Sequence, residues 1–184
     1  AAQAQASLAR ASAALAAMRK LQLDAATAAK AVPSPVPNGV QSGGLMPLNP
    51  GSKATMDCGA GCTRTSWQAD PSWINANGPV ETVQGDGKVM VDITQTQSKA
   101  ILNWQTFNVG ANTTLNFKQG ASDWIALNRV LDPSAAPSRI LGQINAPGSV
   151  YVINRNDIVF GAGSQVNVHT LSASSLDIGE LGTD

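Results

Sequence analysis

The sequence predicts an all-β fold from residue 79 onward, and three observations carry this prediction. Runs of β-branched and aromatic residues recur along this part of the chain, each bounded by Gly, Asn, Asp or Ser. Within the runs apolar and polar residues alternate, as at Val89, Val91 and Ile93, which places the apolar side chains on one face of a strand. No amphipathic stretch of about a dozen residues separates the runs, which argues against βαβ crossovers.

The amino-terminal part of the chain, residues 1–31, predicts a helix. It is rich in Ala, contains neither Gly nor Pro, and repeats apolar residues such as Leu8, Leu15 and Met18 at helical spacing. Four basic residues oppose the single Asp24, so binding to a partner or a membrane surface is one interpretation. A helix that packs on the domain, or extends from it, is favoured because a mostly Ala stripe buries little area.

Two irregular segments follow this helix. Residues 32–52 hold five prolines and four glycines, which excludes a continuous helix or central strand and predicts a linker. Residues 53–79 contain Cys58, Cys62 and two tryptophans around a turn at Pro71, and predict an irregular lead into the β domain.

The strands are most densely spaced in residues 150–168. Three apolar runs occur there, separated by a polar tetrapeptide at 154–157 and by a pair of glycines. Asn and Asp accept turn conformations and bond to their own backbone, so the tetrapeptide predicts a tight corner. Earlier strands are expected at residues 80–83, 89–94, 100–104, 114–117 and 124–130.

Asn repeatedly follows an apolar strand residue. This pattern occurs at Asn108, Asn128, Asn145, Asn154 and Asn167. Stacked coils of a parallel solenoid would place such residues at equivalent corners, bonded to backbone groups above and below. A β-sandwich would accept the same alternation of strands and turns, so the residues alone leave both architectures open.

The composition and motifs disfavour most chemical functions. Basic and acidic residues balance at 12 each, which gives no field that would attract nucleic acid. The only histidine, His169, has no carboxylate close in sequence to form a catalytic pair, and the chain has no Gly-x-Ser-x-Gly or phosphate-binding glycine motif. Cys58, Cys62 and Asp57 are too few ligands for a closed zinc site. We therefore expect neither an enzyme nor a cofactor.

A family resemblance lies in residues 154–158, Asn-Arg-Asn-Asp-Ile followed by Val-Phe-Gly. They resemble the Asn-Pro-Asn-Gly-Ile motif of the two-partner secretion domain of filamentous-haemagglutinin-like exoproteins, also called the haemagglutination activity domain. Residues 104–110 and 165–175 are similar to that family's flanking blocks, and the matching blocks run from about 79 to 178. Arg155 and Asp157 depart from the family's usual Pro and Gly.

The resemblance implies a fold and a route of export. The fold is a right-handed parallel β-helix with an amino-terminal cap and extra antiparallel strands, here expected over residues 53–184. The domain belongs to a large exoprotein or adhesin of a Gram-negative bacterium, secreted to the cell surface through the periplasm and outer membrane. The implied partner is an outer-membrane β-barrel transporter whose POTRA domains recognise the monomeric domain, which then nucleates the β-helix. Host or cell-surface receptors would be bound through a downstream region.

The same resemblance assigns a secretion motif and a redox state. The motif residues are Phe107, Asn108, Val109, Asn154, Arg155, Asn156, Asp157 and Ile158. In an exported chain Cys58 and Cys62 are expected to form a disulfide, and the three residues between them allow the required approach.

Two other classes compete with this reading. A polysaccharide-processing β-helix enzyme would need clustered carboxylates, and Asp132, Asp157 and Asp177 do not obviously cluster in the sequence. A carbohydrate-binding module would use exposed tryptophans as stacking platforms, chosen from Trp67, Trp73, Trp104 and Trp124. Trp104 and Trp124 lie in apolar strands, where burial is the commoner outcome.

Overall fold

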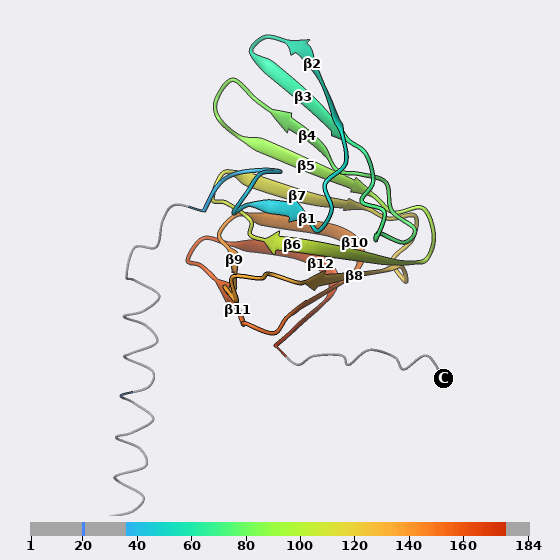
Figure 1. Cartoon of the computed structure of the whole chain (residues 1–184), viewed down its shortest axis with the longest axis vertical. Coiled ribbons are helices and arrows are strands. Elements are labelled where there is room, and N and C mark those ends of the chain that lie inside the picture. Colours follow the sequence, from blue (N-terminus) through green and yellow to red (C-terminus); the bar gives the residue numbers. More distant parts are fainter. Residues whose placement is uncertain (1–19, 21–35, 176–184) are drawn as a thin grey trace, which may run out of the picture. The chain divides into compact units, whose positions relative to one another are not determined.

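The computed structural model describes residue 20 and residues 36–175, and from residue 36 onward every regular element is a strand (Figure 1). The helix expected over residues 1–31 lies outside the described residues except for Lys20. No helix among the described residues is long and apolar enough to cross a membrane. The strands are β1 (Leu45–Pro47), β2 (Lys53–Gly59), β3 (Cys62–Trp67), β4 (Val80–Val83), β5 (Val89–Thr94), β6 (Lys99–Phe107), β7 (Thr113–Lys118), β8 (Ile125–Val130), β9 (Ser138–Ile140), β10 (Gln143–Asn154), β11 (Ile158–Phe160) and β12 (Gln165–Ser174).

Strands β5 to β12 wind into a parallel β-helix with three faces. The first face stacks β5, β7 and the first halves of β10 and β12, all in parallel register. The second face stacks β6, β8 and the second halves of β10 and β12. The third face pairs β9 with β11, and Val109 of the first coil bridges to Ile140. This arrangement confirms the predicted all-β solenoid and excludes a sandwich.

The core of the helix consists of columns of apolar side chains. On the first face Val91, Leu115 and Ile144 occupy the same position in successive coils, and none is more than 1% exposed. The neighbouring residues of each strand point outward because strand side chains alternate between faces. The second face has a matching buried column of Ala100, Ala126 and Val150.

The segment expected to be a linker instead caps the first coil where the structure describes it. β1 pairs antiparallel with β6, and Val40 and Leu45 are only 4% and 0% exposed. Gly39, at φ 78°, lies against Glu81, whose Oε2 accepts a hydrogen bond from Val40 N at 2.5 Å. Burial raises the pKa of the Glu81 carboxyl, against the opposing effects of this bond and of Lys53. The Pro and Gly residues break regular structure, yet they leave Val40 and Leu45 free to enter the core.

An antiparallel extension continues the first face beyond β5. Strands β4, β3 and β2 pair in that order, and in Figure 1 they rise away from the stacked coils. Residues 53–67 are thus a regular hairpin where the sequence predicted irregular structure. Their side chains are largely polar and all seven residues of β2 are exposed, so no apolar alternation marked the strands. At the hairpin tip Cys58 and Cys62 form a disulfide with a Cα–Cα distance of 5.1 Å.

A buried carboxylate fixes the turn that follows β3, in the segment between β3 and β4. Asp70 is 1% exposed, and its Oδ1 accepts hydrogen bonds from Ser72 N and Oγ at 2.7 and 2.6 Å. Its Oδ2 accepts a bond from the backbone N of Asn49. Burial acts to raise the pKa of Asp70, but these hydrogen bonds outweigh it and hold the pKa below its usual value. The ionised Asp70 side chain therefore links Asn49, which follows β1, to the turn at Ser72.

Candidate functional site

The third face brings the two segments of the proposed motif together. Val109 N donates to Arg139 O at 2.9 Å, and Leu141 N donates to Val109 O at 2.8 Å. On the other side of β9, Ser138 pairs with Ile158 in parallel register. We call residues 107–109, 138–140 and 154–160 the motif face. The two predicted segments lie on the first and third coils of this face, with β9 of the second coil between them.

Residues 154–157 form the tight corner that the sequence predicts. Asp157 N donates to Asn154 O at 3.2 Å, which closes a four-residue turn between β10 and β11. Asp157 has φ 79°, a left-handed conformation that Gly adopts without steric cost. The family's usual Gly at this position therefore matches the backbone found here, and Asp, which tolerates this region better than most residues, replaces it.

The side chain of Asn154, at the end of β10, organises this corner. It is 1% exposed, its Oδ1 accepts a hydrogen bond from Asn156 N at 2.9 Å, and its Nδ2 donates to Ser138 Oγ at 2.9 Å. Nδ2 also lies 3.3 Å from Ala136 O. Asn156 enters this network through its backbone only. The prediction that both amide side chains bond to backbone groups is thus wrong for Asn156, because Asn154 alone of the two supplies a side-chain bond to the backbone of this turn.

Replacing Asn154 by Ala is expected to lower the free energy of unfolding by about 1–3 kcal/mol, because buried donors and acceptors lose their partner. Replacing Asn156 by Ala should cost less than about 0.5 kcal/mol, as at an ordinary surface site. Urea unfolding of both variants measures the difference. Equal midpoints for the two variants would contradict the role given to Asn154.

Three of the eight motif residues are buried in the folded domain. Phe107 and Val109 are each 0% exposed. Asn108 is held on both sides, since its Nδ2 donates to Gly43 O at 3.0 Å and its Oδ1 accepts from Arg139 N at 2.7 Å. Arg155 and Asp157 are exposed, and Ile158 is half-buried. A partner that meets the folded domain therefore cannot contact the complete motif.

The recurrent Asn residues do not form one set of corners. Asn108 and Asn154 lie at corners and bond to backbone groups, as expected. Asn128 instead lies inside β8, fully buried in the core. Asn145 and Asn167 lie within strands and bond to other side chains. Ser138, which bonds to Asn154, and Asn128, which bonds to Trp104 in the core, were not identified as functional from the sequence. A lone polar residue in a strand gives no indication that its side chain points inward.

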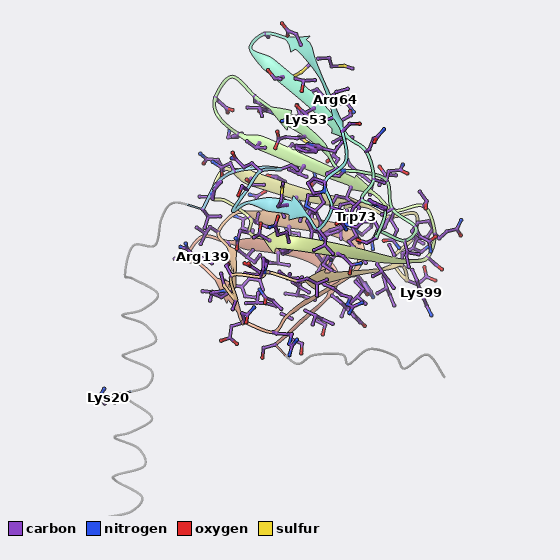
Figure 2. The ribbon with its side chains drawn as sticks, in the orientation of Figure 1. Lys20, Lys53, Arg64, Trp73, Lys99 and Arg139 are labelled. Carbon is purple, nitrogen blue, oxygen red and sulfur yellow. A yellow bond between two sulfur atoms is a disulfide. The ribbon has the colours of Figure 1, made fainter. Side chains whose placement is uncertain are left out.

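Among the described residues, Trp73 and Trp104 are buried, whereas Trp67 and Trp124 are half-buried. No group of three or more His, Cys, Asp or Glu side chains in this part of the chain could hold a metal ion. Trp73 and Trp104 are 7% and 0% exposed, so they cannot serve as stacking platforms. Lys53 Nζ lies 4.9 Å from the ring centroid of Trp67. Figure 2 shows Lys53 and Arg64 on the hairpin, away from Lys99 and Arg139, so these basic side chains do not gather in one patch.

Comparisons with known proteins identify relatives for this fold and motif face. The family model described as the TPS secretion domain matches residues 69–181. Two heme/hemopexin-binding proteins of Haemophilus influenzae, the second from strain ATCC 51907 / DSM 11121 / KW20 / Rd, are 34% and 35% identical over 86 and 77 residues. The matches cover 47% and 42% of this chain but only 9% and 8% of those proteins. The crystal structure of the HMW1 secretion domain from Haemophilus influenzae aligns with a TM-score of 0.45 and 23% identity, over 72% of this chain and 29% of that chain.

The matched residues 69–181 contain both segments of the motif face and every coil of the β-helix that the structure describes. The family is one of secretion domains and not of enzymes. Its exoproteins pass through the periplasm and outer membrane to the cell surface. Because the family model covers well over half of the sequence, the chain belongs to the TPS, or two-partner secretion, secretion-domain family.

Proposed function

We propose that this domain is recognised in its unfolded state by the POTRA domains of a dedicated outer-membrane transporter, through residues 107–109 and 154–158. The observation that carries this proposal is the burial of three motif residues. Phe107, Val109 and Asn154 are at most 1% exposed after folding, so a signal that includes them must be read earlier. Membership of a secretion-domain family supports the same order of events.

The mode of recognition follows from the backbone. An unfolded strand-forming segment offers unpaired N–H and C=O groups, which can add to the edge of a transporter sheet by β-augmentation. The same groups pair within the domain later, as Val109 does with Arg139 and Leu141. Release from the transporter and folding therefore exchange one set of strand pairs for another.

We further propose that the folded domain nucleates the β-helix of the exoprotein. Its two ends differ. β1 and the β2–β3–β4 extension cover the first coil, whereas β12 pairs only with β10 among the described strands. A solenoid needs one blunted end to prevent edge association and one open end on which a further coil can stack. Binding to host or cell-surface receptors is assigned to other regions of the exoprotein.

In vitro binding tests the recognition step. Purified POTRA domains of the partner transporter would be titrated with the 184-residue chain, either folded or freshly diluted from urea. We expect the unfolded chain to bind at least about tenfold more tightly, equivalent to about 1.4 kcal/mol. Binding of equal strength to the folded chain would contradict recognition before folding. A scrambled chain of the same composition serves as the control for nonspecific capture of unfolded protein.

A further inference from the structure

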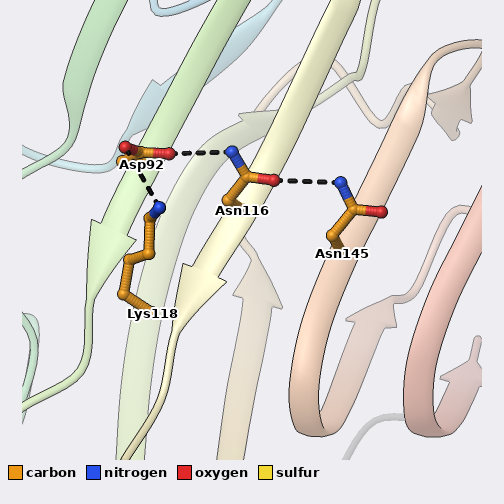
Figure 3. A network of polar contacts seen from close by, with 4 residues as sticks. All are labelled: Asp92, Asn116, Lys118 and Asn145. Carbon is orange, nitrogen blue, oxygen red and sulfur yellow. Dashed lines mark hydrogen bonds and ion pairs between the residues drawn. The ribbon is translucent and has the colours of Figure 1, made fainter.

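A ladder of polar side chains runs along the outer side of the first face. Asp92, Asn116, Asn145 and Asn167 occupy the same register position on β5, β7, β10 and β12. Asn116 Nδ2 donates to Asp92 Oδ1 at 2.8 Å, Asn145 Nδ2 to Asn116 Oδ1 at 2.9 Å, and Asn167 Nδ2 to Asn145 Oδ1 at 3.0 Å. Figure 3 shows the first two of these bonds.

The ladder has a direction, and Asp92 sets it. Every amide donates toward the preceding coil, and Asn116 and Asn145 also accept from the following one. An Asn amide could face either way, since it carries both a donor and an acceptor, but an ionised carboxylate only accepts. Asp92 therefore forces Asn116 to present its Nδ2, and each later amide follows. Lys118 Nζ lies 3.5 Å from the other carboxylate oxygen, so both oxygens of Asp92 face donors (Figure 3).

The ladder ends at an edge that continues the core and that no other described strand covers. β12 pairs with β10 and with no other described strand. Val166 follows Ile144 in its column yet is only half-buried, and Leu171 follows Val150 yet is 37% exposed. Asn167 directs its Nδ2 toward Asn145, so the repeat of the ladder leaves its Oδ1 facing the next position as an acceptor. This edge therefore presents apolar columns beside a hydrogen-bond acceptor.

We propose that the β12 edge receives a further parallel coil that places a side-chain N–H donor, such as an Asn amide, opposite Asn167, and that Asp92 imposes this preference from the far end of the ladder. The inference rests on the proposed nucleating function and specifies its chemistry. A carboxylate opposite Asn167 would place an acceptor against its Oδ1, which is also an acceptor. An amide there would donate to Oδ1 and extend the ladder of hydrogen bonds. Continuity with the interface between β10 and β12 argues for a coil as the occupant.

The first experiment reads the direction of the ladder in the chain as it exists. Long-range NMR correlations detect scalar couplings across N–H···O=C hydrogen bonds. We expect couplings from Asn145 Nδ2 to Asn116 Cγ and from Asn167 Nδ2 to Asn145 Cγ. Couplings in the reverse sense, or none in a chain whose β12 amides are protected from exchange, would overturn the proposal. The Asp92→Asn variant should weaken the preference and show both senses.

The second experiment adds a coil. A copy of residues 165–175 is fused after Asp184 with two added residues, so that it follows β12 at the spacing that separates Gln143 from Gln165. Three versions carry Asn, Asp or Leu opposite Asn167. We expect the Asn version to slow hydrogen exchange of the outer β12 amides at least about tenfold more than the Asp version, from a hydrogen-bond difference of about 1.4 kcal/mol. The gap should shrink in an Asp92→Asn background.

The outcomes separate the two proposals. Equal protection by all three versions would overturn the donor preference while the nucleating function stands. Protection by none of them would overturn the nucleating function itself, and the NMR couplings would still decide the direction of the ladder. A dimer of the unextended chain in sedimentation experiments, with β12 amides protected only at high concentration, would mean that a second copy occupies the edge and would contradict the assignment to a coil.

Discussion

Replacing Trp104 by Ala is expected to lower the free energy of unfolding by about 3–5 kcal/mol, the range for truncating a large buried aromatic side chain. Trp104 is 0% exposed and packs against Trp73 and Phe107, with ring centroids 4.8 and 5.3 Å away. Its Nε1 donates to Asn128 Oδ1 at 3.0 Å inside the core. The loss is a large share of the roughly 5–15 kcal/mol that stabilises a typical domain. Urea unfolding followed by circular dichroism measures it.

A double-mutant cycle separates packing from hydrogen bonding at this site. Trp104→Phe keeps most of the apolar volume but leaves Asn128 Oδ1 unpaired, which should cost about 1–3 kcal/mol. Asn128→Leu fits a column that already holds Leu102 and Val152. The double variant removes both partners and should therefore recover part of that cost. A Trp104→Ala variant within about 1 kcal/mol of the parent chain would contradict the central place given to this side chain.

The sequence predicted the coils of the β-helix, but it did not predict β1 and β2, which lie before the first coil. Strands β5 to β8 were predictable because inward residues such as Val91 and Leu115 alternate with outward polar ones. β1 was missed because its Pro and Gly neighbours dominate the local pattern, and the burial of Leu45 depends on the open side of β6. β2 was missed because an exposed edge strand needs no apolar face.

The motif could be found in the sequence, but the structural role of each of its residues could not. The turn at residues 154–157 followed from its Asn and Asp content. Which Asn holds the corner depends on strand direction: Asn154 ends β10 facing inward, toward Ser138 of the neighbouring coil, and Asn156 does not. Residues 107–109 and 154–158 lie on either side of β9, and this placement depends on the number of residues in each coil. That number varies along the chain and cannot be predicted from the local sequence.

The second large effect is expected on export. Replacing Ile158 by Pro removes a backbone donor and fixes φ in the segment proposed to pair with the transporter, so secretion should fall at least about tenfold. A Pro at position 158 also disfavours the left-handed conformation of Asp157, at φ 79°. The turn is therefore distorted in addition to losing a backbone donor. Ile158→Ala keeps the donor and is the matched control, with secretion expected near that of the parent.

Arg155→Pro provides a second control, because it restores the family's usual residue. Residue 155 is the first central position of the turn closed by Asp157 N and Asn154 O, and Pro is favoured at that position. We expect this variant to be secreted normally. Val152→Pro should also block secretion. Because Val152 lies in the middle of β10, between β8 and β12, this variant should also disrupt folding and is therefore a less specific test of the signal.

The most direct test of the central claim is co-expression of the exoprotein with its transporter, with the fraction of exoprotein in the medium as the measurement. Secretion should depend on the transporter, proceed normally for the Ile158→Ala and Arg155→Pro variants, and leave the Ile158→Pro variant in the periplasm. Normal secretion of the Ile158→Pro variant, or secretion of the parent without the transporter, would contradict the assignment of this motif as the export signal.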